Sequence, residues 1–481
     1  MSNTIAKDRL KKKGFSGKVG LRKHPKPEKP MTEILALLQN IAPVVSTTIL
    51  QQLSQVIYGM LISNGRITML EISRWTEAGG SYRTIQRLYH TPLLWLQIQW
   101  IFFTSQLQRP EHEYIAVGDE VVFGKAGKET YGIGHFFSSL QNRVIPSLSF
   151  FTFSVIDVTE RASYPIHAVQ MVKQKEDKKQ GSATELQEKK KSANAKKRPV
   201  GRPKGSKNKK DEKPILSPEL LRIQPVLETF LAILKGVLAV QYLVMDGHFG
   251  NYPSTWMVLQ TGLHFISKLR SDAALYEPFT GKYCGRGARP KYGDKVDIHK
   301  MKKKYLKSDT REDGVRVQIY QAALLNKGFA FPINVVVVLK TKLSTGKQAH
   351  IILFSTDLNL THEKLYDYYA LRFQIEFNFR DAKQYWGLDD FMNVKQEAVT
   401  NAANLAFFMV NFSSVLLRRY RESNPEFSVL DLKSHYRGCR YASEIIKLLP
   451  QRPNGILLAE IFEQIARLGM VHPTFEPIPT S

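Results

Sequence analysis

Hydrophobic and polar positions follow two different periods along this chain, and the change separates two kinds of region. Residues 31–105 carry apolar positions at helical spacing, which predicts a purely helical segment. From residue 111 onward, short apolar runs bounded by turn residues predict strands mixed with helices. The predicted strands span residues 114–118, 131–137, 148–157, 241–245, 264–269, 315–322, 333–340 and 350–354, and further helices are predicted over 218–238 and 254–260. This mixture predicts an α/β fold whose site lies at the strand edge.

The helical segment contains a pattern that resembles a helix-turn-helix. A helix over residues 66–78 is followed by a break at Gly79-Gly80 and by a second helix, for which Ser81 is the predicted N-cap. Such a unit would offer exposed side chains of its second helix to a DNA groove, namely Tyr82, Arg83, Gln86 and Arg87. Helix pairs without any DNA contact are equally common, so an ordinary structural pair is the alternative.

One helical segment in the last third of the chain carries an unusual polar stripe. At about 100° per residue, Tyr369, Arg372, Glu376 and Lys383 fall within an arc of roughly 60°, and Arg380 lies at its edge. The flanking positions are apolar, namely Leu371, Phe373, Ile375, Phe377 and Phe379. The face predicted to meet water is formed by a second stripe of Gln374, Asn378 and Asp381. The first stripe is therefore predicted to point into a site, and the alternative is an ordinary salt bridge on a solvated helix.

Two acidic residues directly follow predicted strands. Asp119 follows the strand over 114–118, and Asp246 follows the strand over 241–245. With Glu376 they supply three carboxylates, a set suited to two divalent ions that activate an attacking oxygen and stabilise a leaving oxygen in phosphodiester transfer. Mg²⁺ is the expected ion because it prefers oxygen ligands and retains water, with Mn²⁺ as an alternative. A single strand-terminal aspartate is more often a cap or turn residue, so the combination carries this prediction.

The net charge of +26 is concentrated in two segments. Residues 1–30 hold ten Lys/Arg against two acids, and residues 173–213 hold sixteen against six, so the two arms carry +8 and +10. Neither arm has an interleaved apolar face, which favours nucleic acid over a membrane as the partner. Two cysteines provide neither a disulfide framework nor a zinc ligand set, as is typical of a reducing compartment. No signal peptide or membrane span is expected.

The spacing Tyr369-x2-Arg372-x3-Glu376-x6-Lys383 resembles the signature of DDE transposases of bacterial insertion sequences, in the insertion-sequence-four-like group. The first-acid motif of that family is Asp-x-Thr, whereas this chain has Asp119-Glu120-Val121 and lacks the threonine. Asp119 is preferred as the first acid by register, with Glu120 as the alternative. The second acid is Asp246, in the sequence Met-Asp-Gly-His-Phe-Gly-Asn.

The resemblance implies a ribonuclease-H-like catalytic core with a β-rich insertion, preceded by an all-helical N-terminal domain. It implies a homodimer that nicks transposon ends, frees a 3′-OH and joins it to target DNA, with Asp119, Asp246 and Glu376 as catalytic metal ligands. Tyr369, Arg372, Arg380 and Lys383 would contact the double-stranded DNA. Some members pass through a DNA hairpin, which here would require a Phe or Tyr to hold a base, because no Trp lies between Trp256 and Trp386. A cytoplasmic, nucleoid-associated bacterial protein is expected.

The second basic arm contains Arg198-Pro199-Val200-Gly201-Arg202-Pro203-Lys204-Gly205, which resembles an AT-hook. Pro203 blocks a helix, Gly201 permits close approach, and Arg202 is attracted to the negative potential of a narrow minor groove. Arg198 and Lys204 would add phosphate contacts. A solvated charged linker is the alternative.

The predicted organisation has eight parts. They are a basic arm (1–30), a helical DNA-binding domain (31–110), three catalytic core parts (111–172, 215–270 and 356–425), an AT-hook-like linker (173–214), a β-rich insertion (271–355) and a C-terminal helical region (426–481). Two other functions remain open from the sequence. One is a non-catalytic DNA-binding protein derived from a transposase, and the other is a nuclease that cuts without joining.

Overall fold

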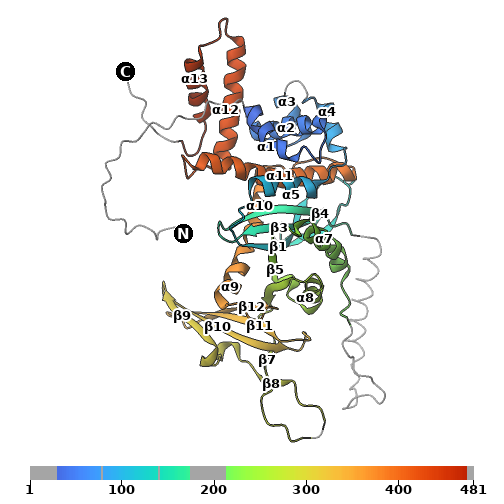
Figure 1. The fold of residues 1–481 in the computed structure, drawn as a ribbon, viewed down its shortest axis with the longest axis vertical. Coiled ribbons are helices and arrows are strands. Elements are labelled where there is room, and N and C mark those ends of the chain that lie inside the picture. Colours follow the sequence, from blue (N-terminus) through green and yellow to red (C-terminus); the bar gives the residue numbers. More distant parts are fainter. Residues whose placement is uncertain (1–29, 77–79, 139–140, 174–212, 286, 474–481) are drawn as a thin grey trace, which may run out of the picture.

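The fold was analysed in a computed structural model that describes residues 30–76, 80–138, 141–173, 213–285 and 287–473 (Figure 1). The predicted basic arm at the N-terminus and the AT-hook-like sequence with Arg198, Arg202 and Lys204 lie outside the described residues. Figure 1 shows an elongated molecule with a sheet across its middle, a helical end that carries α12 and α13, and a β-rich end that carries β7 and β8.

The first described segment is helical. Its helices are α1 (Pro30–Leu38), α2 (Thr47–Ile62), α3 (Met69–Trp75), α4 (Tyr82–Tyr89) and α5 (Trp95–Gln106), with the short 3-10 helix η1 (Gln39–Ile41) after α1. They share one hydrophobic core with the C-terminal helices. Between the two groups of helices, Trp95 Nε1 donates a hydrogen bond to Asn401 Oδ1 at 2.7 Å.

The predicted helix pair of this segment is partly correct. The N-cap at Ser81 is confirmed, because its side chain accepts a hydrogen bond from the Thr84 amide. The helix predicted over 66–78 is too long at both ends, since α3 begins after the Thr68 cap and ends at Trp75. Arg66 and Ile67 lie before the helix. The Ile67 amide donates a hydrogen bond to the Asp390 carboxylate at 2.9 Å and so is used outside a helix.

The described strands form one mixed sheet of twelve strands, in the order β2-β3-β1-β5-β6-β12-β11-β10-β7-β8, with β4 on β3 and β9 on β10. Strands β3 and β4 run antiparallel along one side of β1, while β5 and β6 run parallel on the other. The expected mixed α/β fold is therefore confirmed. The strands are β1 (Tyr114–Gly124), β2 (Gly134–Ser138), β3 (Arg143–Asp157), β4 (Ala162–Gln170), β5 (Val240–Met245), β6 (His264–Leu269), β7 (Leu275–Pro278), β8 (Tyr292–Lys295), β9 (Leu306–Glu312), β10 (Val315–Asn326), β11 (Ile333–Lys342) and β12 (Gln348–Ser355).

Each face of the sheet is covered by a different helix. On one face, Phe230 of α7 (Pro218–Leu234) stacks on Phe153 of β3 at 5.2 Å. On the opposite face, Asn378 of α10 (Gln374–Gln384) donates to the Ser163 Oγ of β4 at 2.7 Å. Alternation along a strand sends neighbouring side chains to opposite faces, so the sequence position of each β1 residue decides which helix it meets.

The remaining helices surround the sheet and extend its helical end. Helix α8 (Tyr252–Leu259) follows β5, and α9 (His362–Leu371) precedes α10; α11 (Gln396–Arg421), α12 (Val429–Leu448) and α13 (Gly455–Arg467) complete the chain. Short 3-10 helices are η2 (Gly247–Phe249), η3 (Ile298–Lys300) and η4 (Lys303–Tyr305). By length and composition α11 could cross a membrane, but 89% of its apolar window is buried inside the protein, where it serves as a core helix.

Two expectations about the polar-stripe helix are wrong. The segment is not one helix, because α9 ends at Leu371 and α10 begins at Gln374. The two turns at the junction tighten to i→i−3 hydrogen bonds, as in Glu376 N donating to Phe373 O at 3.1 Å. The stripe predicted to face water is also wrong in part, since Asn378 is buried against Ser163.

Candidate active site

The side-by-side pairing of β1 and β5 places two acidic residues at neighbouring positions. The parallel register pairs Gly118 with Met245, and the next residues along the two strands are Asp119 and Asp246. Strand β1 was expected to end at Asp119, which is wrong, because it continues to Gly124 along β3 and pairs Asp119 with Thr152. Strand β5 does end at Met245, so Asp119 has a strand partner on one side only. Its carboxylate therefore lies where the sheet opens.

The loop after β5 holds Asp246 by several local contacts. The Asp246 Oδ1 accepts from the His248 amide at 2.9 Å, and its backbone carbonyl accepts from Ser267 Oγ at 2.7 Å. The loop then crosses the end of β6 so closely that a Cβ at Gly250 would lie 2.0 Å from the Lys268 carbonyl oxygen. Glycine at this position is required by the close approach, which fixes the backbone that carries Asp246.

Arg372, at the junction between α9 and α10, joins two of the three acids. Its Nη1 donates to Asp119 Oδ2 at 3.0 Å and its Nη2 donates to Glu376 Oε1 at 3.2 Å. The Arg372 side chain is 13% exposed, and its buried Nε has no hydrogen-bond partner among the described residues. One guanidinium thus connects carboxylates from β1 and α10.

The charges of the other two carboxylates affect the pKa of Asp119. Burial raises the pKa of Asp119 to about 7; the Arg372 guanidinium opposes this rise, whereas the negative charges of Asp246 and Glu376 add to it. A divalent cation relieves such repulsion and favours the ionised carboxylates. A set of three carboxylates with a solvent-reachable member, Glu376, fits a metal that prefers oxygen ligands and retained water. Asp119, Asp246 and Glu376 are the residues that would hold it.

The alternative first acid, Glu120, points to the opposite face of the sheet. Glu120 pairs with Phe151, on the face covered by α7, and its carboxylate accepts a hydrogen bond from Ser149 Oγ. Burial raises the pKa of Glu120, against the effect of that hydrogen bond. The structure thus brings Asp119, and not Glu120, to Arg372 and the face covered by α10.

The other members of the polar stripe have different surroundings. The Tyr369 ring centroid is 5.8 Å from Arg372 Cζ, and burial raises the pKa of the Tyr369 phenol. Lys383 Nζ donates to the Val122 carbonyl of β1 at 3.1 Å, and burial lowers its pKa. Arg380 is exposed and forms an ion pair with Asp381 at 2.8 Å. Tyr369 therefore adjoins the acids, Lys383 fastens α10 to β1, and Arg380 faces solvent.

The candidate DNA contacts on α4 belong to a different part of the molecule. Arg83 and Arg87 are both exposed there, and neither side chain forms an ion pair with any described residue. No hydrogen bond or ion pair joins them to the carboxylates within the described part of the chain. Their exposure agrees with the predicted availability to a DNA groove, and their role stays a prediction.

Two aromatic side chains that flank Glu376 are exposed, although both were expected only as apolar flanks of the polar stripe. Phe373 and Phe377 are 49% and 37% exposed, and their rings meet edge to face at 5.6 Å. Arg380 Cζ lies 4.8 Å above the Phe377 ring. Exposed large apolar groups beside an acidic residue are a feature that helical periodicity alone does not reveal.

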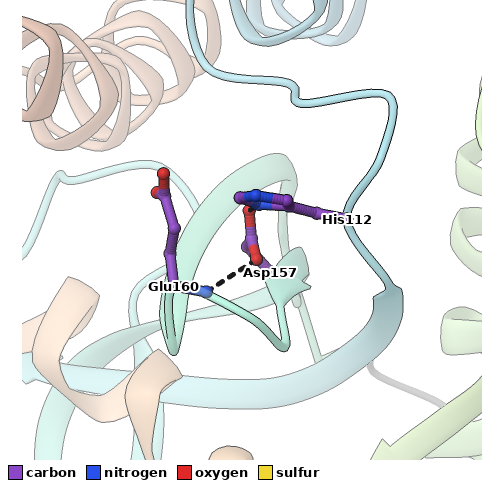
Figure 2. A group of neighbouring side chains, drawn as sticks. All are labelled: His112, Asp157 and Glu160. Carbon is purple, nitrogen blue, oxygen red and sulfur yellow. Dashed lines mark hydrogen bonds and ion pairs between the residues drawn. The ribbon is translucent and has the colours of Figure 1, made fainter.

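A second group of titratable residues was not predicted and lies at the other end of β3 (Figure 2). His112, Asp157 and Glu160 offer ligand atoms within 4.8 Å of one another. However, the buried Asp157 already pairs with His112 Nδ1 at 2.7 Å and accepts from the Glu160 amide at 2.9 Å. Glu160 in turn pairs with Arg418. Groups of the protein itself thus satisfy these carboxylates. Their contacts connect the segment before β1, the β3–β4 turn and α11.

Residues 43–324 match the model of the DDE superfamily endonuclease family. The match covers more than half of the 481 residues and includes Asp119 and Asp246, but it ends before Glu376. The family indicates a metal-dependent nuclease with DNA as its substrate. A search of curated proteins found no match.

Proposed function

The chain belongs to the DDE superfamily endonucleases, and from this premise we propose that it is a DNA transposase of the insertion-sequence-four-like group. The observation that carries the proposal is the bridging of Asp119 and Glu376 by Arg372, with Asp246 on the neighbouring strand. Asp119, Asp246 and Glu376 are the three acids that the resemblance implies, and Arg372 belongs to its signature. The three acids lie more than 120 residues apart in sequence.

The core topology supports the same assignment. Strands β4, β3, β1, β5 and β6 are adjacent in that order, with antiparallel pairing up to β1 and parallel pairing beyond it. This arrangement is consistent with a ribonuclease-H-like core. In the same proposal, strands β7 to β12 form the β-rich insertion, and α1 to α5 form the helical DNA-binding domain.

The proposed reaction consists of two phosphodiester exchanges. In the first, a water oxygen attacks the phosphorus at the transposon end, the bond from phosphorus to the 3′ oxygen breaks, and a free 3′-OH and a 5′-phosphate result. In the second, that 3′-OH attacks a target phosphodiester, one bond forms as one breaks, and a target 3′-OH leaves. The number of phosphodiester bonds is conserved in the second step, so joining needs no external energy source.

In this proposal some residues of the site bind the metal ions and others contact the DNA. Two Mg²⁺ ions at Asp119, Asp246 and Glu376 would activate the attacking oxygen and stabilise the leaving oxygen. Arg372 would turn its unpartnered Nε–H toward a phosphate oxygen, and the adjacent Tyr369 would limit water access to it. Lys383 would keep α10 at a fixed distance from β1.

The exposed aromatic pair suggests how an unstacked base could be held at the same place. Phe373 and Phe377 lie on either side of Glu376 in sequence and present their rings to solvent. Any nucleobase offers a π face to such rings, and stacking contributes about 1–3 kcal/mol per base in single-strand binding. This pair supplies the phenylalanine that a hairpin route would require in a chain without tryptophan in this interval.

A homodimer on DNA is part of the proposal. Residues 441–471 carry three Lys/Arg and three Glu, so this projecting hairpin is neutral in a strongly basic chain. Its exposed apolar side chains include Leu448 and Ile456, 84% and 77% exposed. A neutral apolar surface suits a second copy of the chain and not a phosphate backbone. Light scattering of the protein and of Ile456→Asp checks this, with a dimer and a monomer as the expected masses.

The decisive experiment uses duplexes that carry the inverted repeats flanking the gene. We expect Mg²⁺-dependent nicking that EDTA abolishes, followed by products in which the freed 3′ end is joined to target DNA. Nicked DNA without joined products would instead establish a nuclease that cuts without joining. Tight binding with no cleavage at any Mg²⁺ or Mn²⁺ concentration would establish a non-catalytic DNA-binding protein.

A further inference from the structure

The β-rich insertion carries a concentration of positive charge that the proposed function does not use. Residues 279–307 contain ten Lys/Arg and two Asp, a net charge of +8. The two basic arms account for +18 of the total of +26, so the rest of the chain carries +8. This 29-residue segment therefore accounts for all the net charge outside the arms, and the rest of the sequence has no net charge.

The part of the segment from β8 onward, residues 292–307, is fixed to the sheet. Strand β7 pairs with β8 at Tyr276 and Lys295, and Ile298 is buried in the core. Tyr305 OH donates to Glu277 Oε1 at 2.8 Å, which ties η4 back to β7. The lysines that project from this frame keep their spacing without further ordering, so a ligand that contacts several of them meets a preorganised surface.

Acidic neighbours neutralise only a small part of this charge. Glu277 pairs with Lys302 at 2.8 Å and with Lys304 at 3.7 Å. The exposed cations of the segment that form no ion pair with any described residue are Lys282, Arg289, Lys291, Lys295, Lys300, Lys303 and Lys307. Like charges gathered in this way repel one another, and a polyanion bound across them removes the repulsion.

We propose that the described residues of the segment 279–307 form a surface that binds the phosphate backbone of duplex DNA away from the bond that is cut. The proposal rests on the proposed function, which supplies DNA as the polyanion. Lysine ammonium groups act as point charges on phosphates and carry little sequence information, so this surface positions DNA and does not select it. In Figure 1 the strands β7 and β8 lie at the far end of the molecule, with β12 and α9 between them and β1. DNA at the carboxylates must therefore extend toward β7 and β8 to reach this surface.

The test removes three of the unpaired charges and measures binding without any metal. The variant is Lys300→Gln/Lys303→Gln/Lys307→Gln in the full chain, and the matched control is Arg109→Gln/Lys128→Gln/Lys235→Gln, which removes three exposed cations from elsewhere. The probe is a duplex of arbitrary sequence of about 40 base pairs, titrated in EDTA across a salt series. We expect the slope of log K against log salt to become less steep by about 2.7, since each lost phosphate contact contributes about 0.9, with affinity roughly tenfold lower near physiological salt.

Three further measurements make the result decisive. Lys300→Arg/Lys303→Arg/Lys307→Arg keeps the charge and is expected to restore both slope and affinity. A duplex of about 15 base pairs is expected to show a smaller effect of the glutamine variant, because it offers fewer phosphates at once. An unchanged slope, or an equal loss in the control variant, overturns the proposal. The binding assay contains no metal and is therefore independent of cleavage. If the glutamine variant lowers the salt slope but the protein never cleaves DNA, only the proposed function is refuted. If the protein cleaves DNA but the salt slope of the glutamine variant is unchanged, only this surface is refuted.

Discussion

The side chain of Glu376 is more exposed than that of Asp119, at 41% against 18%. Glu376→Gln keeps the size and hydrogen-bonding capacity of the side chain but removes the charge that a divalent ion needs. We expect nicking and joining to fall by about a thousandfold or more, the loss of several kcal/mol of transition-state stabilisation. DNA binding should remain intact. Cleavage and gel-shift assays on the same end substrate check both expectations.

Lys383→Ala is the companion to that variant on the same helix. Lys383 donates to the Val122 carbonyl and is not in contact with the acids, so its loss should weaken DNA positioning and affect joining more than nicking. Full cleavage by Glu376→Gln would contradict the metal role of Glu376 whatever the outcome for Lys383.

Phe377 and Phe379 offer a matched pair, because they lie two residues apart on one helix and differ in burial. Phe379 is 8% exposed and its ring meets Phe407 at 6.2 Å, so Phe379→Ala should cost about 3–5 kcal/mol of unfolding free energy. Phe377→Ala should cost about 1 kcal/mol or less, since its ring faces solvent. If the exposed ring stacks on a base, Phe377→Ala should weaken binding of a single-stranded oligonucleotide by about 1–3 kcal/mol. Equal binding by wild type and Phe377→Ala would remove stacking from the proposal.

At the scale of elements, α12 is fastened to α2 through a buried lysine. Lys433 Nζ donates to the Met60 carbonyl at 2.7 Å and lies 4.9 Å from the Trp386 ring centroid. Burial lowers the pKa of Lys433 to about 7; Arg437 adds to this effect and Asp390 opposes it. The ammonium form is therefore disfavoured in the folded protein relative to the unfolded chain.

This pKa predicts how the stability that depends on Lys433 changes with pH. Between about pH 7 and pH 10 the unfolded chain keeps a proton on Lys433 that the folded protein has released. The unfolding free energy therefore rises with pH in this window, by at most about 1.4 kcal/mol per pH unit. Urea unfolding of wild type and Lys433→Met at pH 7 and pH 9 measures it, because the variant lacks this titration. If the difference in unfolding free energy between wild type and Lys433→Met is the same at pH 7 and pH 9, Lys433 does not titrate in this window.

At the scale of the whole molecule, the basic segment 173–213 is expected to contribute to DNA affinity without contributing to chemistry. Replacing residues 173–213 by an uncharged Gly/Ser segment of equal length removes a net charge of +10. We expect weaker binding to all DNA sequences and a shallower salt dependence, because fewer counterions are released. Cleavage at saturating DNA should persist. A salt series decides the matter, and an unchanged slope would indicate that this segment is only a solvated linker.

Several features of this protein follow from the sequence alone, because they depend on local order. The change of hydrophobic period predicted the mixed α/β fold, and Ser81 was recognised as an N-cap because its contact lies three residues away. The acids at 119 and 246 were visible because each follows an apolar run. Net charge and the spacing of the signature also need no structure. The family match agrees with the DDE type that this spacing indicated.

Other features were decided by contacts between distant segments. Strand β4 contains Pro165, and β9 is polar and largely exposed, so both were missed; each is a strand because of its pairing, with β3 and with β10. The continuation of β1 beyond Asp119 depends on β3, and the tight turn at Arg372 separates α9 from α10. Sequence periodicity names the residues of a face, but only packing decides which face meets the core, because burial depends on partners far along the chain.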